Sequence, residues 1–219
     1  IKGTGNLNLS TYLRKTPDLA IAGVEEVRVW TSFTVSGGQK PGTNAGLAIT
    51  APTVIIEEGD LNGKRGIAFD GLYLAIGADN DLNLKYVSLQ NDKHLGLASL
   101  GNVTLNNCSL LGGHRGKVYV YAQETLTVDG VDLSSDLAEV YMEARTVNLS
   151  NINFPRDSDV FLKSELGAID GKYPNFGTVE AGRVNFINNV KYDGQSIHDR
   201  ASFDQHGDRI KVGIINSNP

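Results

Sequence analysis

The sequence predicts an all-β fold, a right-handed single-stranded parallel β-helix (a β-solenoid) with about 21–23 residues per coil. Three observations predict it. An alternating apolar and polar pattern recurs at near-constant spacing, a second strand family recurs between its copies, and the intervening turns are rich in Asn, Asp, Gly and Ser. Period-two alternation without helical periodicity indicates short strands, and a fixed repeat length is typical of a solenoid.

The first strand family consists of two short alternating strands joined by a two-residue turn. Its copies start at Leu82, Val103, Leu126, Val147 and Val184. Successive offsets are 21, 23, 21 and 37 residues, and the last copy has one extra residue in its turn. The turns end at Tyr86, Asn107, Gly130, Asn151 and Asn189. Because Asn and Gly adopt a left-handed backbone at low cost, these positions are expected to be left-handed.

The second strand family alternates in the same register. Its copies start at Leu72, Leu95, Val118, Val140 and Val160, with offsets of 23, 23, 22 and 20 residues. Each strand is expected to pair with the same strand of the next coil, about 4.8 Å away. The alternation directs apolar residues and Cys108 into the core, where the thiol is expected to be inert. It leaves two outward polar ladders: Asn83, Thr104, Thr127, Asn148 and Asn185, and Ser88, Ser109, Asp132, Asn153 and Lys191.

Two segments depart from the regular repeat. Residues 1–66 are less regular and are expected to supply a few strands and a cap, with a short helix or capping turn at 16–26, where a Pro-Asp pair favours a helix start. Residues 67–219 are expected to form the β-helix coils, and the offset of 37 residues places an insertion at about 163–181. The strands expected in the first segment are Val27–Trp30, Phe33–Val35, Leu47–Ile49 and Val54–Ile56.

The composition narrows the range of partners. A net charge of −5 argues against nucleic acid, because phosphate binding needs clustered Lys and Arg. No apolar run approaches the roughly 18 residues of a membrane span. A single cysteine cannot form a disulfide within the chain. The partners expected are a second copy, associating end to end or laterally, another surface protein, or a glycan.

Several stretches carry a resemblance to a known class of proteins. They are VNLSNINFP at 147–155, LKSELGAID at 162–170 and GRVNFINNVKYDG at 182–194. Over roughly residues 67–215, the chain resembles the C-terminal coils of very large exported bacterial β-helix proteins, of the filamentous-haemagglutinin and autotransporter-passenger kind. The resemblance implies export, an extracellular or cell-surface location in a bacterium, and a structural or adhesive role.

An outward aromatic stripe is the candidate binding or interface surface. It contains Tyr73, Tyr119, Tyr141 and Phe161, is interrupted by Gly96, and has Tyr121 two positions further along one strand. Exposed aromatic rows stack on sugar rings or form protein interfaces. The alternative is that the insertion covers the stripe. Its apolar residues are Leu166, Ile169, Tyr173 and Phe176. In either case the stripe and the insertion form one unit.

An enzyme is the alternative class, because polysaccharide lyases and galacturonases share the β-helix. A lyase needs a calcium-held carboxylate cluster beside a basic residue. Asp136, Asp157 and Asp159 lie in turns that are expected to stack on one edge, although turn aspartates also form Asx turns. The paired-aspartate motif of a galacturonase is absent, and no catalytic residue is assigned. We therefore expect a non-enzymatic structural or adhesive segment that self-associates into fibres, with no cofactor other than calcium.

Overall fold

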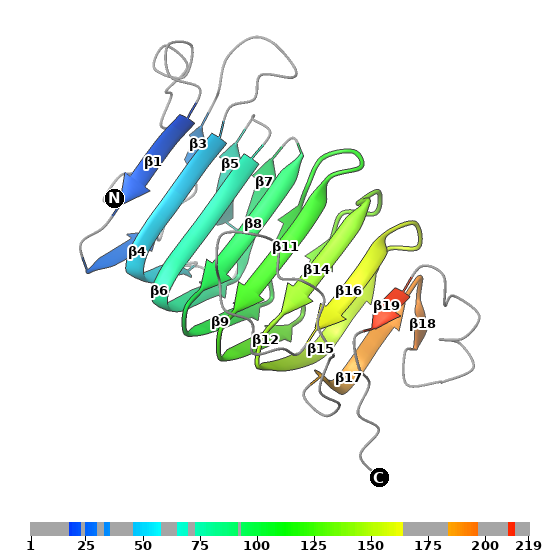
Figure 1. Ribbon diagram of the computed structural model, residues 1–219. Helices are drawn as coiled ribbons and strands as arrows, with labels where there is room; N and C mark the ends of the chain where they lie inside the picture. The colour runs from blue at the N-terminus through cyan, green and yellow to red at the C-terminus, as the bar shows by residue number, and fades with distance from the viewer. Residues whose placement is uncertain are drawn as a thin grey trace.

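The computed structural model describes residues 18–22, 25–29, 33–35, 46–57, 65–69, 73–91, 93–163, 184–196 and 210–212. Their strands wind into a parallel β-solenoid with three faces (Figure 1). All of the described strands except one short strand at residues 195–196 pair in parallel with the corresponding strand of a neighbouring coil. The all-β parallel β-solenoid predicted from the repeats is confirmed.

The first face is a continuous row of parallel strands. It contains β1 (Asp18–Ala22), the first half of β4 (Gly46–Glu57), the first half of β6 (Tyr73–Lys85), β8 (His94–Ser99), β11 (Lys117–Ala122), β14 (Glu139–Glu143), β16 (Asp159–Lys163) and β19 (Ile210–Val212). Aligned core positions in five successive strands are Leu74, Leu95, Val118, Val140 and Val160. The coils between them therefore contain 21, 23, 22 and 20 residues, close to the predicted repeat length.

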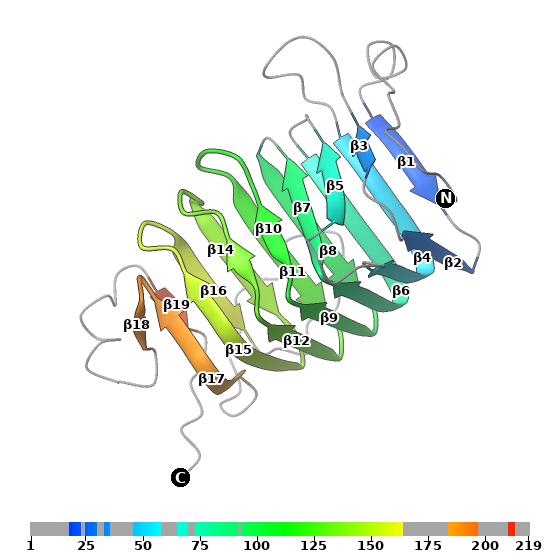
Figure 2. The same ribbon diagram turned by 180° about the vertical axis from the view of Figure 1, so that it is seen from behind.

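The second and third faces continue the same coils (Figure 2). The second face contains β2 (Glu26–Val29), the second halves of β4 and β6, β9 (Asn102–Asn106), β12 (Thr125–Asp129), the first half of β15 (Thr146–Phe154) and the first half of β17 (Val184–Tyr192). The third face contains β3 (Phe33–Val35), β5 (Arg65–Phe69), β7 (Val87–Asn91), β10 (Ser109–Leu111) and β13 (Asp132–Leu133). The second halves of β15 and β17 pair beyond them, and β18 (Gln195–Ser196) pairs antiparallel with β17.

The core consists of apolar rows stacked along the solenoid axis. One row contains Leu82, Val103, Leu126 and Val147, which pair in register and are fully buried. Cys108 is also fully buried, and its thiol donates to the carbonyl oxygen of Leu84 at 3.3 Å. This placement confirms the inward direction predicted for the cysteine. Burial of these rows supplies the main driving force for folding.

A left-handed residue ends the turn between the second and third faces in each of five coils. The φ angles are 53° at Tyr86, 51° at Asn107, 67° at Gly130, 51° at Asn151 and 48° at Asn189. All five positions were predicted, because the turn has the same length in each repeat. The asparagine side chains add a ladder along the axis. Asn151 Nδ2 donates to Asp129 Oδ1 at 2.7 Å, and Asn189 Nδ2 donates to Asn151 Oδ1 at 3.1 Å.

The extra residue predicted in the last copy is also present. The register between β15 and β17 shifts after Leu149, so that Phe186 pairs with Leu149 and Asn188 pairs with Ser150. Ile187 is the unpaired residue between them, and 62 % of its surface is exposed. A bulge with an outward side chain absorbs one additional residue without displacing the core rows.

The strands at the N-terminal end differ in one respect from expectation. The short helix or capping turn predicted within residues 16–26 is wrong for residues 18–22, because these residues form β1, which pairs in register with β4. The apolar residues Leu19 and Ile21 alternate with alanines, which suits a strand added to the sheet. The strands expected nearby coincide with β2, β3 and β4. Pairing continues across residue 66, because β4 pairs with β6.

Candidate functional site

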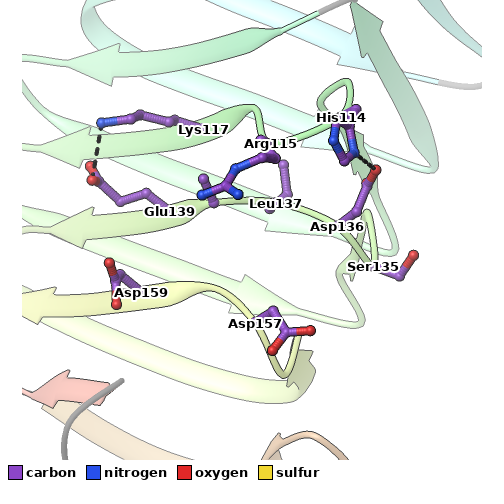
Figure 3. Close-up of a pocket in the computed structure, with 10 residues that line it drawn as sticks. His114, Arg115, Lys117, Ser135, Asp136, Leu137, Glu139, Asp157 and Asp159 are labelled. Carbon is purple, nitrogen blue, oxygen red and sulfur yellow. Dashed lines mark hydrogen bonds and ion pairs between the residues drawn. The ribbon is translucent and has the colours of Figure 1, made fainter.

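A pocket of about 750 Å³ opens at the edge where the third face leads into the first (Figure 3). Three stacked turns line it, which connect β10 to β11, β13 to β14 and β15 to β16. Its ionisable residues are His114, Arg115, Lys117, Asp136, Glu139, Asp157 and Asp159. The turns come from three successive coils, so the solenoid itself brings together residues that are about one repeat apart in sequence.

Backbone contacts hold the three turns against one another. Arg115 N donates to Asp136 O at 3.0 Å, and Asp159 N donates to Ala138 O at 2.9 Å. In the first turn, a Cβ atom on Gly116 would lie 1.9 Å from the carbonyl oxygen of Lys93, so only glycine fits between the coils. The pocket therefore has a fixed backbone frame from which its charged side chains project.

An ion pair and a hydrogen bond between side chains cross from one coil to the next within the pocket. Lys117 Nζ lies 3.1 Å from Glu139 Oε2, and His114 Nδ1 lies 3.1 Å from Asp136 Oδ2. Asp159 occupies the next position in the same column, because Lys117 aligns with Glu139 and Glu139 aligns with Asp159 in the strand register. Burial is the largest single effect on Lys117 and disfavours its charged form, but the hydrogen bonds to Glu139 and Tyr119, together with the charges of these two groups, outweigh it and raise the lysine pKa.

The ring of Tyr119 lies beside this charged column. Lys117 Nζ is 6.0 Å from the ring centroid. Burial raises the pKa of the Tyr119 phenol to about 12; the hydrogen bond from Lys117 opposes the rise, and the negative charge of Glu139 adds to it. The phenol is therefore neutral over the physiological range and is available there as a hydrogen-bonding group.

The three aspartates proposed for calcium all line this pocket, from two of its stacked turns. They do not converge. Among the residues that the structure describes, no three His, Cys, Asp or Glu side chains are arranged to hold a metal ion. Asp136 contacts His114 instead, while Asp157 and Asp159 point from the next coil (Figure 3). The geometry does not support the calcium interpretation, because the carboxylates are spread along the edge.

Sequence reasoning missed Arg115, Lys117 and Glu139 as members of the site. A signal was present, because Lys117, Glu139 and Asp159 each precede the first core residue of a repeated strand. Reading the outward positions of each coil in register would have grouped them. Arg115 has a left-handed φ of 51°, which the turn pattern did not predict.

The outward aromatic ladder is present on the first face in part. Tyr119, Tyr141 and Phe161 align in register, and successive ring centroids are 6.2 Å apart in both pairs. All three side chains are half-buried. Tyr121 lies in the neighbouring column, aligned with Glu143, whose carboxylate is fully buried and accepts a hydrogen bond from the Tyr141 hydroxyl.

Tyr73 does not belong to this ladder. It aligns with His94 and stacks on the imidazole with a centroid distance of 5.2 Å, while Ala75 takes the ladder position beside Gly96. The predicted register was wrong by two residues. Leu95 was expected to pair with Leu72, but it pairs with Leu74. The run from residue 72 to 76 alternates throughout, so alternation alone allows both registers.

The other aromatic candidates, Tyr173 and Phe176, lie outside the described residues, as does the predicted insertion from residue 164 onward. Comparison with known proteins gives no relative: no protein-family model, curated protein or solved structure matches the chain. Within the described segments, no helix is long and apolar enough to cross a membrane. Beyond the β-solenoid fold itself, the resemblance to exported bacterial proteins stays a prediction.

Proposed function

We propose that the chain is a non-enzymatic structural or adhesive segment of an extracellular or cell-surface bacterial β-helix protein. The observation that carries this proposal is the polar ladder of the second face. It contains Asn83, Thr104, Thr127, Asn148 and Asn185, aligned coil after coil. Side chains also join across coils there, since Asn185 Nδ2 donates to Asn148 Oδ1 at 2.8 Å.

A solenoid of this kind suits a rigid spacer. Each coil adds about 4.8 Å along the axis, and backbone hydrogen bonds run parallel to that axis throughout. Further coils lengthen such a rod without changing its cross-section or requiring a new core. The strand edges at the ends of a solenoid pair with other chains unless they are covered, so self-association into fibres forms part of the proposal.

Location and assembly test the proposal directly. Antibodies raised against the purified chain are applied to intact and to lysed cells of the bacterium that encodes it. Labelling of intact cells, together with rods or filaments of constant width in negative-stain microscopy, is the expected result. Antigen that is detected only after lysis contradicts a surface role, and a monodisperse monomer in light scattering contradicts fibre formation.

A polysaccharide-binding or polysaccharide-cleaving protein is the second candidate, and the pocket beside Tyr119 favours it. Hydrogen-bond donors and acceptors line this pocket, and an aromatic ladder begins two residues further along the same strands. Incubation with polysaccharides separates cleavage from binding. New reducing ends, or the ultraviolet absorbance of unsaturated uronates, would establish an enzyme, whereas a non-enzymatic segment produces neither.

A further inference from the structure

The pocket at the edge of the first face contains two charged groups that the solenoid does not use. Among the described residues, neither the Arg115 guanidinium nor the Asp159 carboxylate has an ion-pair or hydrogen-bond partner for its side chain. The Lys117–Glu139 ion pair and the His114–Asp136 hydrogen bond engage four of the other five ionisable groups. The pocket thus contains an unpaired donor and an unpaired acceptor.

We propose that this pocket binds an uncharged oligosaccharide. The inference rests on the adhesive role proposed above and gives it a ligand class and a location. Sugar hydroxyls both donate and accept hydrogen bonds, so they match a lining whose basic donors lie on the first turn and whose carboxylate acceptors lie on the next two. Arg115 offers five N–H donors and Asp159 two acceptor oxygens, and each can bind hydroxyls of a different sugar in a chain that spans the stacked turns.

The charge of the lining selects against acidic ligands. Four carboxylates face two permanent cations, which gives a formal charge of −2 with His114 neutral. Uronic and sialic acids would meet like charge on binding. Apolar ligands are also disfavoured, because Leu137 and Ala138 are the only apolar lining residues and Leu137 is buried beneath the surface.

The shape of the site suits an extended chain of sugars. The lining spans three coils, with a rise of about 4.8 Å per coil. This rise is close to the length of one hexose unit, so a glycan that runs along the solenoid axis would meet one turn per sugar. In the view of Figure 3, the Arg115 guanidinium lies between the Lys117–Glu139 pair and the His114–Asp136 pair, and Asp157 and Asp159 lie on the next coil.

The backbone at Arg115 directs its side chain into the pocket. Its φ of 51° is left-handed, and the amide is fixed by the hydrogen bond to Asp136 O at 3.0 Å. Residues with long side chains rarely adopt a left-handed backbone, which glycine and asparagine adopt more often. A variant at this site must therefore accept the same backbone, and asparagine does so while it removes the guanidinium.

Isothermal titration of the full chain with defined probes tests the proposal. The probes are neutral oligosaccharides of glucose, mannose and galactose, an oligogalacturonate and an oligolysine peptide. We expect saturable binding of at least one neutral oligosaccharide, weakened about tenfold or more by Arg115→Asn and by Asp159→Asn. Arg145→Asn and Asp79→Asn change exposed residues outside the pocket and should leave the dissociation constant within twofold.

Several results would overturn the proposal. Absence of binding to every neutral probe is one, and neutral binding that both pocket variants retain is another. Binding of oligogalacturonate alone would assign an acidic glycan, and binding of oligolysine alone would assign a basic peptide. Circular dichroism confirms that each variant folds. Surface labelling of cells that express the parent chain separates the two proposals, since display at the surface without binding of any neutral probe counts against the pocket only.

Discussion

The carbonyl oxygen of Asn80 lies 2.0 Å from the position that a Cβ atom would take on Gly101. The two residues belong to adjacent coils at the corner between the first and second faces. Ser99 joins them, because its hydroxyl donates to Asn80 O at 2.8 Å and accepts from Gly101 N at 3.0 Å. The corner therefore has room for glycine alone.

Substitution of this glycine should destabilise the solenoid. In Gly101→Ala the new methyl group meets backbone, so two coils must separate, and we expect a loss of about 1–3 kcal/mol or more. Gly96→Ala is the matched control, because a Cβ atom there meets nothing within 4 Å; its effect should stay within about 0.5 kcal/mol. Urea unfolding measures both, and equal midpoints would contradict the packing argument.

The left-handed turn position predicts a stabilising substitution. Tyr86 has a φ of 53°, whereas three of the other four coils have asparagine in this position. A left-handed backbone costs an ordinary residue about 1–2 kcal/mol. Tyr86→Asn removes that cost but also the contact of Lys85 Nζ with the ring at 5.6 Å, worth about 0.5–1 kcal/mol.

We therefore expect Tyr86→Asn to raise the free energy of unfolding by about 0.5–1 kcal/mol. The reverse change, Asn151→Tyr, should lower it, because the hydrogen bonds with Asp129 and Asn189 are lost as well. Thermal melts of the two variants beside the parent chain check both signs. A destabilised Tyr86→Asn would mean that the aromatic contact outweighs the backbone strain.

The single thiol should report unfolding. Cys108 is fully buried, and its Sγ donates to carbonyl oxygens within the coil stack. A disulfide reagent can therefore reach it only after the coils open, and labelling should be negligible in native buffer. In urea the rate should follow the unfolded fraction measured by circular dichroism. Rapid labelling without urea would show that this part of the stack opens locally.

His94 should give the stability an acid dependence. Burial lowers its pKa from 6.5, and the charges of Lys93 and Lys117 lower it further, against the opposing charge of Glu139. Tyr73 covers one face of the ring. Because the unfolded chain binds this proton more readily, the contribution of His94 is complete above pH 6.5 and is lost as the pH falls through the lower pKa of the folded state.

Unfolding midpoints measured between about pH 7.5 and pH 5 check this expectation. His94→Gln cannot titrate, so its midpoint should fall less over that interval than the midpoint of the parent chain. Parallel curves for the two proteins would place the acid dependence elsewhere. A parent chain that becomes more stable as the pH falls would reverse the sign of the argument.

The sequence of the repeats was sufficient for much of the fold. Alternation fixed which side of each strand faces the core, as in the row that contains Leu82 and Val103. The constant turn length predicted the left-handed residues, and the extra residue in the last copy accounts for the bulge at Ile187. Each of these features depends on a few neighbouring residues, so a single coil contains the information.

The site depended on how the coils stack. Tyr73 lies outside the aromatic ladder. Its alternating segment could pair with the next coil in two registers, and the structure has the one in which Leu74 pairs with Leu95. Arg115 and Asp159 are 44 residues apart in sequence and came together only through two steps of the solenoid. The coil, the direction of its side chains and its turns follow from the sequence, because these are local properties of the chain. The register and the composition of the pocket depend on which residue of one coil lies against which residue of the next, so they are properties of the folded stack.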